Sequence, residues 1–135
     1  MRQGGCLCGD IRYRVEGEPL GSGVCHCRTC RKAASAPSLP FATFPTGAFA
    51  FTRGQPVEFR SSPPVTRSFC GRCGSPLTYR NDAEPGSVDV MTCSLDDPGA
   101  FPPGFHVWVG DKPAWERVAD GLPVYETTRA AGERA

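Results

Sequence analysis

Seven of the eight cysteines in this chain fall into three short groups. The groups are Cys6 and Cys8, then Cys25, Cys27 and Cys30, then Cys70 and Cys73. Thiols two or three residues apart are poorly placed for disulfides with one another, but they can converge on one metal ion. Tetrahedral Zn²⁺ binds thiolates at about 2.3 Å, and C-x-C and C-x-x-C turns can supply sulfurs at a matching spacing. The grouping therefore predicts metal sites.

The number of ligands in each group separates two kinds of site. The first and last groups together provide four thiolates, which would close a structural zinc site. The middle group provides three thiolates and leaves one exchangeable position, as is typical of catalytic zinc. Two alternatives stay open from the residues alone. In the first, each of the two cysteine pairs is a redox dithiol and not part of a metal site. In the second, a fourth ligand from Cys93, His106 or His26 closes the middle group, which then forms a second structural site.

Three cations surround the middle group in the sequence, namely Arg28 within it and Arg31 and Lys32 directly after it. Three thiolates and Zn²⁺ carry a net charge of −1, and nearby cations lower the pKa of thiols that must be deprotonated to bind the metal. The same cations could receive the carboxylates of an anionic thiol. The alternative is a solvated turn in which these charges have no specific partner.

Three further residues are candidates with simpler interpretations. Cys93 stands alone between Thr92 and Ser94, so a small buried side chain is the default interpretation. His106 and Trp108 alternate within 105–109, and a strand there would place both on one face. We interpret His106 as a packed, hydrogen-bonded histidine, with a contact to substrate or to a metal ligand as the alternative. Trp108 is expected in the core or in a pocket wall.

The residues around the cysteine groups favour short strands. Glycine (16) and proline (14) are spread along the chain, which leaves little room for long helices. One helical turn is expected at 31–36, before Pro37. Alternation and aromatic spacing predict strands at 11–15, around Cys25 and Cys27, twice within 39–51, and at 57–60, 88–92, 105–109 and 118–119. Gly74 is expected at positive φ. A mostly β domain of about ten strands follows.

Size and composition restrict the class of protein. A chain of 135 residues is one domain by the usual size range. A formal net charge of +1 without a basic run argues against nucleic-acid binding. There is no apolar leader and no run of about 18 apolar residues, which argues against a membrane span. We therefore expect a cytoplasmic protein with reduced thiols and a flexible tail at 127–135. An oxidised secreted module is the alternative.

Three segments together resemble the glutathione-dependent formaldehyde-activating enzyme family, whose domain also occurs in centromere protein V. They run from Gly5 to Tyr13, from Cys25 to Lys32 and from Phe69 to Leu77. The segments 92–98, 106–109 and 121–123, with Lys112 and Trp115, are similar to the C-terminal half of that family. The resemblance covers about residues 4–126 and implies one domain of this type over 1–126.

The resemblance implies a mostly β, Mss4-like (β-tent) fold held together by zinc. It implies a structural zinc on Cys6, Cys8, Cys70 and Cys73, and a catalytic zinc on Cys25, Cys27 and Cys30. The implied activity is that of a carbon–sulfur lyase, S-(hydroxymethyl)glutathione synthase, acting on glutathione and formaldehyde. One fold with one metal site can serve several thiols or aldehydes.

Substrate contacts are expected from residues beside the middle cysteine group and on the late strand, which are Arg28, Arg31, Lys32, His106 and Trp108. Two other classes of function stay open. One is a zinc-bearing module that binds a small thiol or a protein partner without turnover. The other is a zinc or redox sensor, because a three-thiolate site is exposed to oxidation.

Overall fold

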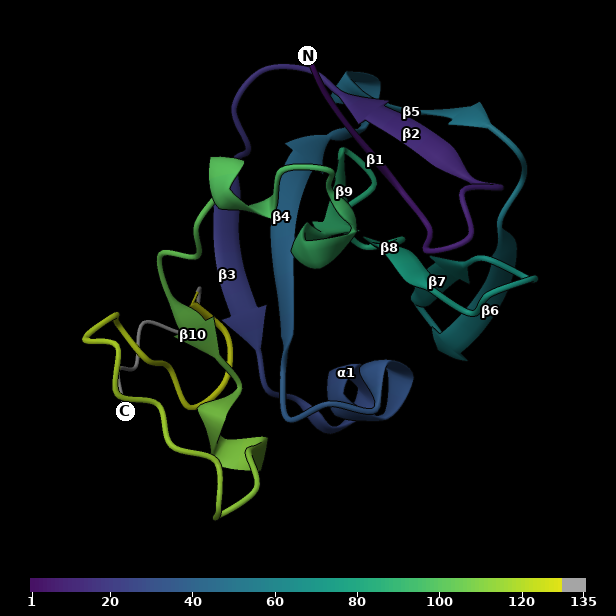
Figure 1. Cartoon of the computed structure of the whole chain (residues 1–135). Coiled ribbons are helices and arrows are strands. Elements are labelled where there is room, and N and C mark those ends of the chain that lie inside the picture. Colours follow the sequence, from purple (N-terminus) through teal and green to yellow (C-terminus); the bar gives the residue numbers. More distant parts are fainter. Residues whose placement is uncertain (130–135) are drawn as a thin grey trace.

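The computed structural model describes residues 1–129, which contain ten strands, one α-helix and four short 3₁₀ helices (Figure 1). The strands are β1 (Arg2–Gly5), β2 (Arg12–Val15), β3 (Gly21–Cys25), β4 (Leu39–Pro45), β5 (Phe49–Arg53), β6 (Val57–Ser62), β7 (Val65–Phe69), β8 (Pro76–Asn81), β9 (Ser87–Met91) and β10 (His106–Val107). The helices are α1 (Arg28–Ala34), η1 (Thr46–Ala48), η2 (Thr92–Ser94), η3 (Pro98–Ala100) and η4 (Val109–Asp111). The expected mostly β architecture is confirmed.

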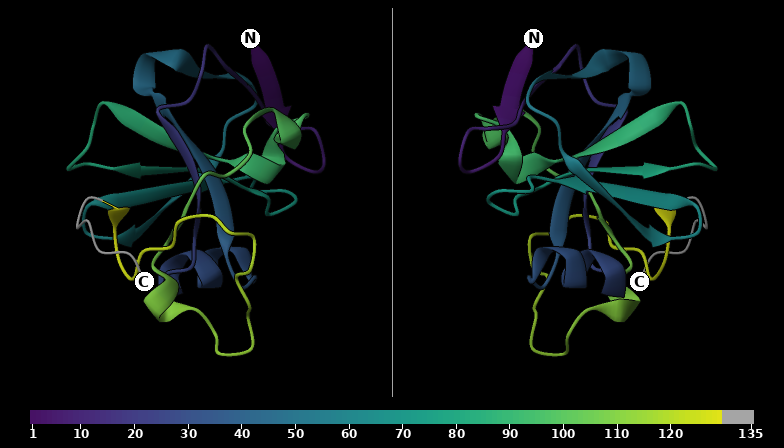
Figure 2. Two further views of the ribbon diagram at one scale, coloured as in Figure 1. Left: turned by 90° about the vertical axis from the view of Figure 1, so that its left-hand side faces the viewer. Right: turned by 90° about the vertical axis from the view of Figure 1, so that its right-hand side faces the viewer.

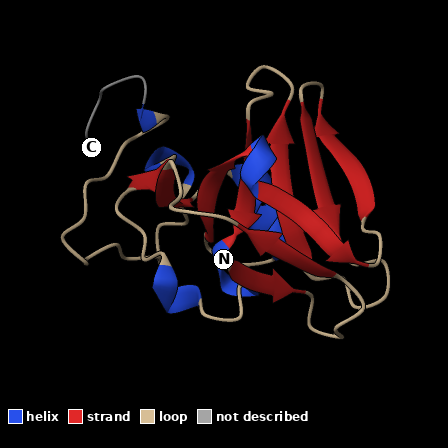
Figure 3. Cartoon of the chain, turned by 90° about the horizontal axis from the view of Figure 1, so that it is seen from above, coloured by secondary structure: helices blue, strands red, loops and turns tan. Residues whose placement is uncertain are grey.

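The strands form two sheets, one with the order β1-β2-β5 and a larger one with the order β10-β3-β4-β9-β8-β7-β6. Neighbouring strands are antiparallel except β10, which pairs parallel to β3. Seen from above, the strands fill one side of the molecule and the long loops after β10 lie on the other (Figure 3). Helix α1 and these late loops lie at the same end of the large sheet (Figure 2).

The main hydrophobic core joins the small sheet to the large one. Tyr13 of β2 and Phe44 of β4 are fully buried in it, and Cys6 and Cys70 belong to the same cluster. The Tyr13 hydroxyl shares a 2.6 Å hydrogen bond with the Ser94 hydroxyl. Gly4 permits this packing, because a Cβ there would lie 2.4 Å from the Tyr13 hydroxyl oxygen. The first and last cysteine groups are thus continuous with the core.

The single helix differs from the expectation at 31–36. Helix α1 begins at Arg28 because Cys27 serves as its N-cap, with its sulfur accepting a hydrogen bond from the Cys30 N–H. It ends at Ala34, where Ser35 adopts a left-handed conformation at φ 49°. The sequence did not indicate a helix start at Cys27, because serine, threonine, aspartate and asparagine are the preferred N-cap residues.

Two late strands also differ from expectation. The strand expected at 105–109 is reduced to the two residues of β10, because Trp108 has φ 58° and leaves the extended conformation. The strand expected at 118–119 does not form, since this segment pairs with no neighbouring strand. Strands β2, β4, β5, β6 and β9 agree with expectation, and Gly74 has the expected positive φ, at 78°. The strand expected around Cys25 and Cys27 ends at Cys25, because Cys27 caps α1, and β1, β7 and β8 were not predicted.

The end of the described chain packs against the domain. The Trp108 N–H donates to the Thr127 carbonyl at 2.9 Å, and the Arg129 guanidinium lies 4.2 Å from the centre of the Phe105 ring. The expected tail at 127–135 lies, from residue 130 onward, outside the described residues. No helix within residues 1–129 is long and apolar enough to cross a membrane.

Candidate metal centre and cleft

The first and last cysteine groups meet in one cluster. The sulfur atoms of Cys6, Cys8, Cys70 and Cys73 all lie within 4.8 Å of one another. The Cys6 and Cys8 sulfurs are 3.6 Å apart, and those of Cys8 and Cys70 are 3.8 Å apart. The turn after β1 and the turn after β7 therefore bring residues more than sixty positions apart to a single point.

Backbone N–H groups surround these sulfurs. The Cys6 sulfur accepts from the Ile11 N–H at 3.3 Å, and the Cys70 sulfur accepts from the N–H groups of Arg72 and Cys73 at 3.4 and 3.5 Å. Each pair is followed by a glycine at positive φ, Gly9 at 83° and Gly74 at 78°. This conformation, which favours glycine, turns the chain sharply after each C-x-C or C-x-x-C and so keeps the sulfurs together.

The four-cysteine cluster fits a tetrahedral metal ion. All its cysteines are free thiols, and sulfurs about 2.3 Å from a tetrahedral zinc would lie about 3.8 Å apart, close to the distances observed. Donors to sulfur stabilise the thiolate form that a metal requires. Hydrogen bonds from Ser75 lower the pKa of Cys73 to about 5. Thiolate donors in this number suit zinc among the common divalent ions.

The middle group forms a second cluster, in which the sulfurs of Cys25, Cys27 and Cys30 lie within 4.8 Å of one another. Cys25 ends β3, Cys27 caps α1, and Cys30 lies in the first turn of the helix. Leu39 and Met91 are buried against Cys30 and form the apolar support behind it. Within residues 1–129, no fourth histidine, cysteine or acidic residue joins this group.

The pKa values of the three thiols are shifted in different directions. Hydrogen bonds from the Cys25 and Cys30 thiols lower the pKa of Cys27 far below its ordinary value. Donation to Cys27, together with burial, raises the pKa of Cys25. The Thr29 hydroxyl, 3.3 Å from the Cys27 sulfur, also stabilises the negative charge there. The cluster is therefore built to hold an anion at Cys27 and to bind a metal ion in place of its protons.

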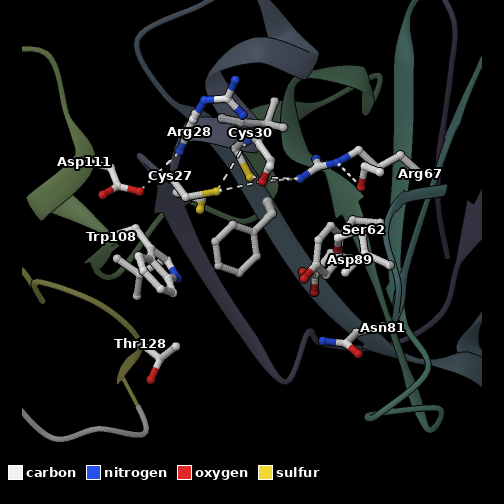
Figure 4. Close-up of a pocket in the computed structure, with 18 of the residues that line it drawn as sticks. Cys27, Arg28, Cys30, Ser62, Arg67, Asn81, Asp89, Trp108, Asp111 and Thr128 are labelled. Atoms are coloured by element: carbon white, nitrogen blue, oxygen red, sulfur yellow. Dashed lines mark hydrogen bonds between the residues drawn. The ribbon is translucent and has the colours of Figure 1, made fainter. Parts of the chain in front are cut away.

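The three-cysteine cluster opens onto a cleft of about 460 Å³ (Figure 4). Cys27, Arg28 and Cys30 lie at one end of it. Trp108, Asp111 and Thr128 line one wall, and Arg67, Ser62, Asp89 and Asn81 line the opposite wall, which the strands β6 to β9 provide. Leu39 and Phe41 of β4 add apolar surface. Three thiols, an apolar floor and a few polar groups on the walls are a typical arrangement for a small-molecule site.

The expected substrate-contact residues do not all gather in the cleft. Arg28 and Trp108 line it, and the Arg28 backbone N–H donates to Asp111 at 3.4 Å. Arg31 and Lys32 instead line a separate hollow with Pro113 and Trp115. The αL conformation of Trp108 breaks the strand alternation, so that Trp108 faces the cleft while His106 does not line it.

His106 is the middle member of a hydrogen-bonded chain behind the cysteines. Its Nδ1 lies 2.9 Å from Nε2 of His26, and its Nε2 lies 2.7 Å from an Asp120 carboxylate oxygen. The Asp120 carboxylate accepts from His106 Nε2–H, and the two rings share a hydrogen bond between His106 Nδ1 and His26 Nε2. Burial lowers the pKa of His26 to about 4, which keeps this ring neutral near pH 7. The chain ties the 120–122 segment to His26, which lies between Cys25 at the end of β3 and Cys27 at the start of α1.

Sequence reasoning missed Arg67. This side chain is 9% exposed, and its Nη2 donates to the Cys30 sulfur at 3.5 Å and to the Thr29 hydroxyl at 3.3 Å. One signal in the sequence was available, because Arg67 is the only charged residue between Arg60 and Arg72. Cys93, in contrast, is exposed and belongs to neither cluster.

Comparison with known proteins gives a consistent result. A family model described as glutathione-dependent formaldehyde-activating enzyme matches residues 1–111. A Halomonas elongata protein provisionally named for the same activity is 27% identical over 127 residues, which cover 87% of this chain and 81% of the relative. An uncharacterised lyase of Schizosaccharomyces pombe is 33% identical over 91 residues, or 65% of each chain.

One solved structure supports the fold. A crystal structure of a Rhodobacter sphaeroides protein superposes with a TM-score of 0.60 at 22% sequence identity, covering 70% of this chain and 87% of the other. At this identity the likeness concerns the fold alone.

Proposed function

The chain belongs to the glutathione-dependent formaldehyde-activating enzyme family, and on that premise we propose that it is a zinc-dependent carbon–sulfur lyase that joins a glutathione-type thiol to formaldehyde or a similar aldehyde. One observation carries the proposal, which is the three-thiol cluster opening onto a cleft without a fourth protein ligand among residues 1–129. The four-cysteine cluster would hold a second, structural zinc. Reduced thiols are needed at both sites, so we also propose a reducing compartment such as the cytoplasm.

The proposed reaction forms one carbon–sulfur bond, and the thiol proton ends on the carbonyl oxygen. A zinc ion held by Cys25, Cys27 and Cys30 would act as a Lewis acid that lowers the pKa of a thiol or polarises a carbonyl. Trp108, Leu39 and Phe41 offer apolar surface suited to an uncharged aldehyde. Arg28, at the same end of the cleft as the sulfurs, is suited to an anionic group of the thiol.

The test must allow for a reaction that proceeds without a catalyst, since thiols add to formaldehyde unaided. We expect zinc-loaded protein to accelerate the exchange of ¹³C-formaldehyde between its hydrate and its glutathione adduct, measured by exchange NMR at equilibrium. The equilibrium position should not change. Exchange at the uncatalysed rate, with glutathione bound, would support the non-catalytic binding module instead. Exchange at that rate without any thiol binding would contradict both.

The two proposed zinc ions should differ in affinity. The four-cysteine cluster is joined to the core and its sulfurs accept backbone N–H donors, whereas the three-cysteine cluster opens onto the cleft. A mild chelator is therefore expected to remove one equivalent of zinc per chain first, with the fold retained. Metal analysis alongside circular dichroism during a chelator titration would measure this. Loss of both equivalents in one step together with unfolding would contradict the division between the sites.

A further inference from the structure

Arg67 is a positive charge buried in the cleft wall, and it forms no salt bridge with the carboxylates of residues 1–129. Its side chain contacts the Ser61 and Thr29 hydroxyls, the Cys30 thiol and the Tyr79 ring. The side chain is only 9% exposed. Charges interact more strongly where water is excluded, so an anion that entered the cleft would gain more from this guanidinium than from an exposed one.

The guanidinium is held in a fixed orientation. Its Nε donates to the Ser61 hydroxyl at 3.2 Å, and its Nη2 donates to Thr29 and to the Cys30 sulfur. Its central carbon lies 5.0 Å from the centre of the Tyr79 ring. The Nη1 group has no hydrogen-bond partner among the described residues, so its two N–H donors are available to a ligand. A fixed donor group loses little conformational entropy on binding.

The acidic residues that line the cleft do not prevent an anion from binding beside Arg67. The Asp111 carboxylate, on the opposite wall, accepts from the Arg28 N–H, and Glu84 is exposed. Asp89 accepts from the Thr43 hydroxyl at 2.5 Å. Burial raises the pKa of Asp89, and the charge of Arg67 opposes part of that shift. A protonated Asp89 would repel an anionic ligand less than a carboxylate would.

We propose that Arg67 makes the cleft selective for thiols that carry a carboxylate, with Nη1 binding the carboxylate while Nη2 stays against Cys30. The inference rests on the proposed function, because it takes a thiol at the three-cysteine cluster as its premise. The contact of Nη2 with Cys30 places the free donors beside the sulfurs. A thiol whose carboxylate can reach Nη1 while its sulfur lies at the three-cysteine cluster therefore matches the site. Arg67 thus takes the role that the sequence had suggested for Arg31 and Lys32.

The test compares two small thiols that differ in charge, 3-mercaptopropionate and the uncharged 2-mercaptoethanol. Calorimetric titration of zinc-loaded protein is expected to show that Arg67→Gln weakens 3-mercaptopropionate binding by at least about tenfold. Binding of 2-mercaptoethanol should change less than about twofold, since the lost interaction is specific to the carboxylate. Arg67→Lys keeps the positive charge but lacks the planar guanidinium. It should weaken the binding of 3-mercaptopropionate only, by a smaller factor than Arg67→Gln does. Zinc content and thermal melts would establish that each variant is folded and loaded.

Arg31→Gln is the matched control, because this arginine lines the separate hollow, and it should leave the binding of both thiols unchanged. Equal weakening of both thiols by Arg67→Gln would overturn the inference and make Arg67 a support for the cysteine cluster. If that variant does not fold, an unchanged affinity of Arg67→Lys for 3-mercaptopropionate would overturn it as well. Wild-type protein that binds glutathione but neither short thiol would overturn the inference alone. Wild-type protein that binds none of the three would overturn the proposed function, and the inference with it.

Discussion

Cys70→Ser is expected to unfold the protein or to lower its melting temperature by at least about 15 °C. Cys70 is 2% exposed, belongs to the main core cluster and accepts two backbone N–H donors at its sulfur. A structural zinc contributes on the order of 10 kcal/mol to folding in small domains, which is comparable to the whole free energy of unfolding of a typical domain. Loss of one thiolate would also release the turn after β1 from the turn after β7.

Thermal melts by circular dichroism, with zinc content measured on the same samples, would check this expectation. Cys93→Ser is the matched control, because Cys93 is exposed and lies outside both clusters. It should melt within about 2 °C of wild type, as surface substitutions usually do. A Cys70→Ser protein as stable as the control would show that this cluster does not hold the fold together.

Cys27→Ser is expected to reduce the catalysed exchange rate by at least about 100-fold while preserving the fold, since the loss of a metal ligand should cost at least as much as the loss of a group that supports one. Serine is among the best N-cap residues, so its hydroxyl can replace the sulfur that accepts from the Cys30 N–H. The variant thus removes a proposed metal ligand without removing the cap of α1.

Exchange NMR and a thermal melt on the same preparation would separate the two effects. Cys27→Ala should lose the cap as well and melt lower than Cys27→Ser, by the equivalent of about 1 kcal/mol. If Cys27→Ser were as unstable as Cys70→Ser, the three-cysteine cluster would be structural too. Full activity in Cys27→Ser would remove Cys27 from the proposed catalytic site.

The convergence of the cysteines could be predicted from the sequence because ligand spacing is local information. A C-x-C or C-x-x-C turn brings its own sulfurs together, and Gly74 at positive φ was foreseeable from its place directly after Cys73. The pairing of the first group with the last followed from the number of ligands a closed site needs. Strands such as β2 and β9 agreed with expectation because their alternation reflects one buried face.

The walls of the cleft could not be predicted in the same way, because they depend on which strands become neighbours. Arg67 lies in a segment for which no strand was predicted, and the position of β7 between β6 and β8 directs its side chain toward Cys30. The αL conformation of Trp108 has no local signal, since tryptophan rarely adopts it, and it decides that Trp108 rather than His106 faces the cleft. Helix α1 begins before the expected position because Cys27, an uncommon N-cap residue, caps it.

The hydrogen-bonded chain from Asp120 to His26 has a consequence for how related enzymes could diverge. The family match ends at residue 111, yet Asp120 and the cleft residue Thr128 lie beyond it. The cysteine clusters and the strands that carry them lie wholly within the match. Evolution can therefore alter one cleft wall by changing or exchanging the segment after residue 111. Such a change would alter the cleft while every candidate metal ligand stays in place.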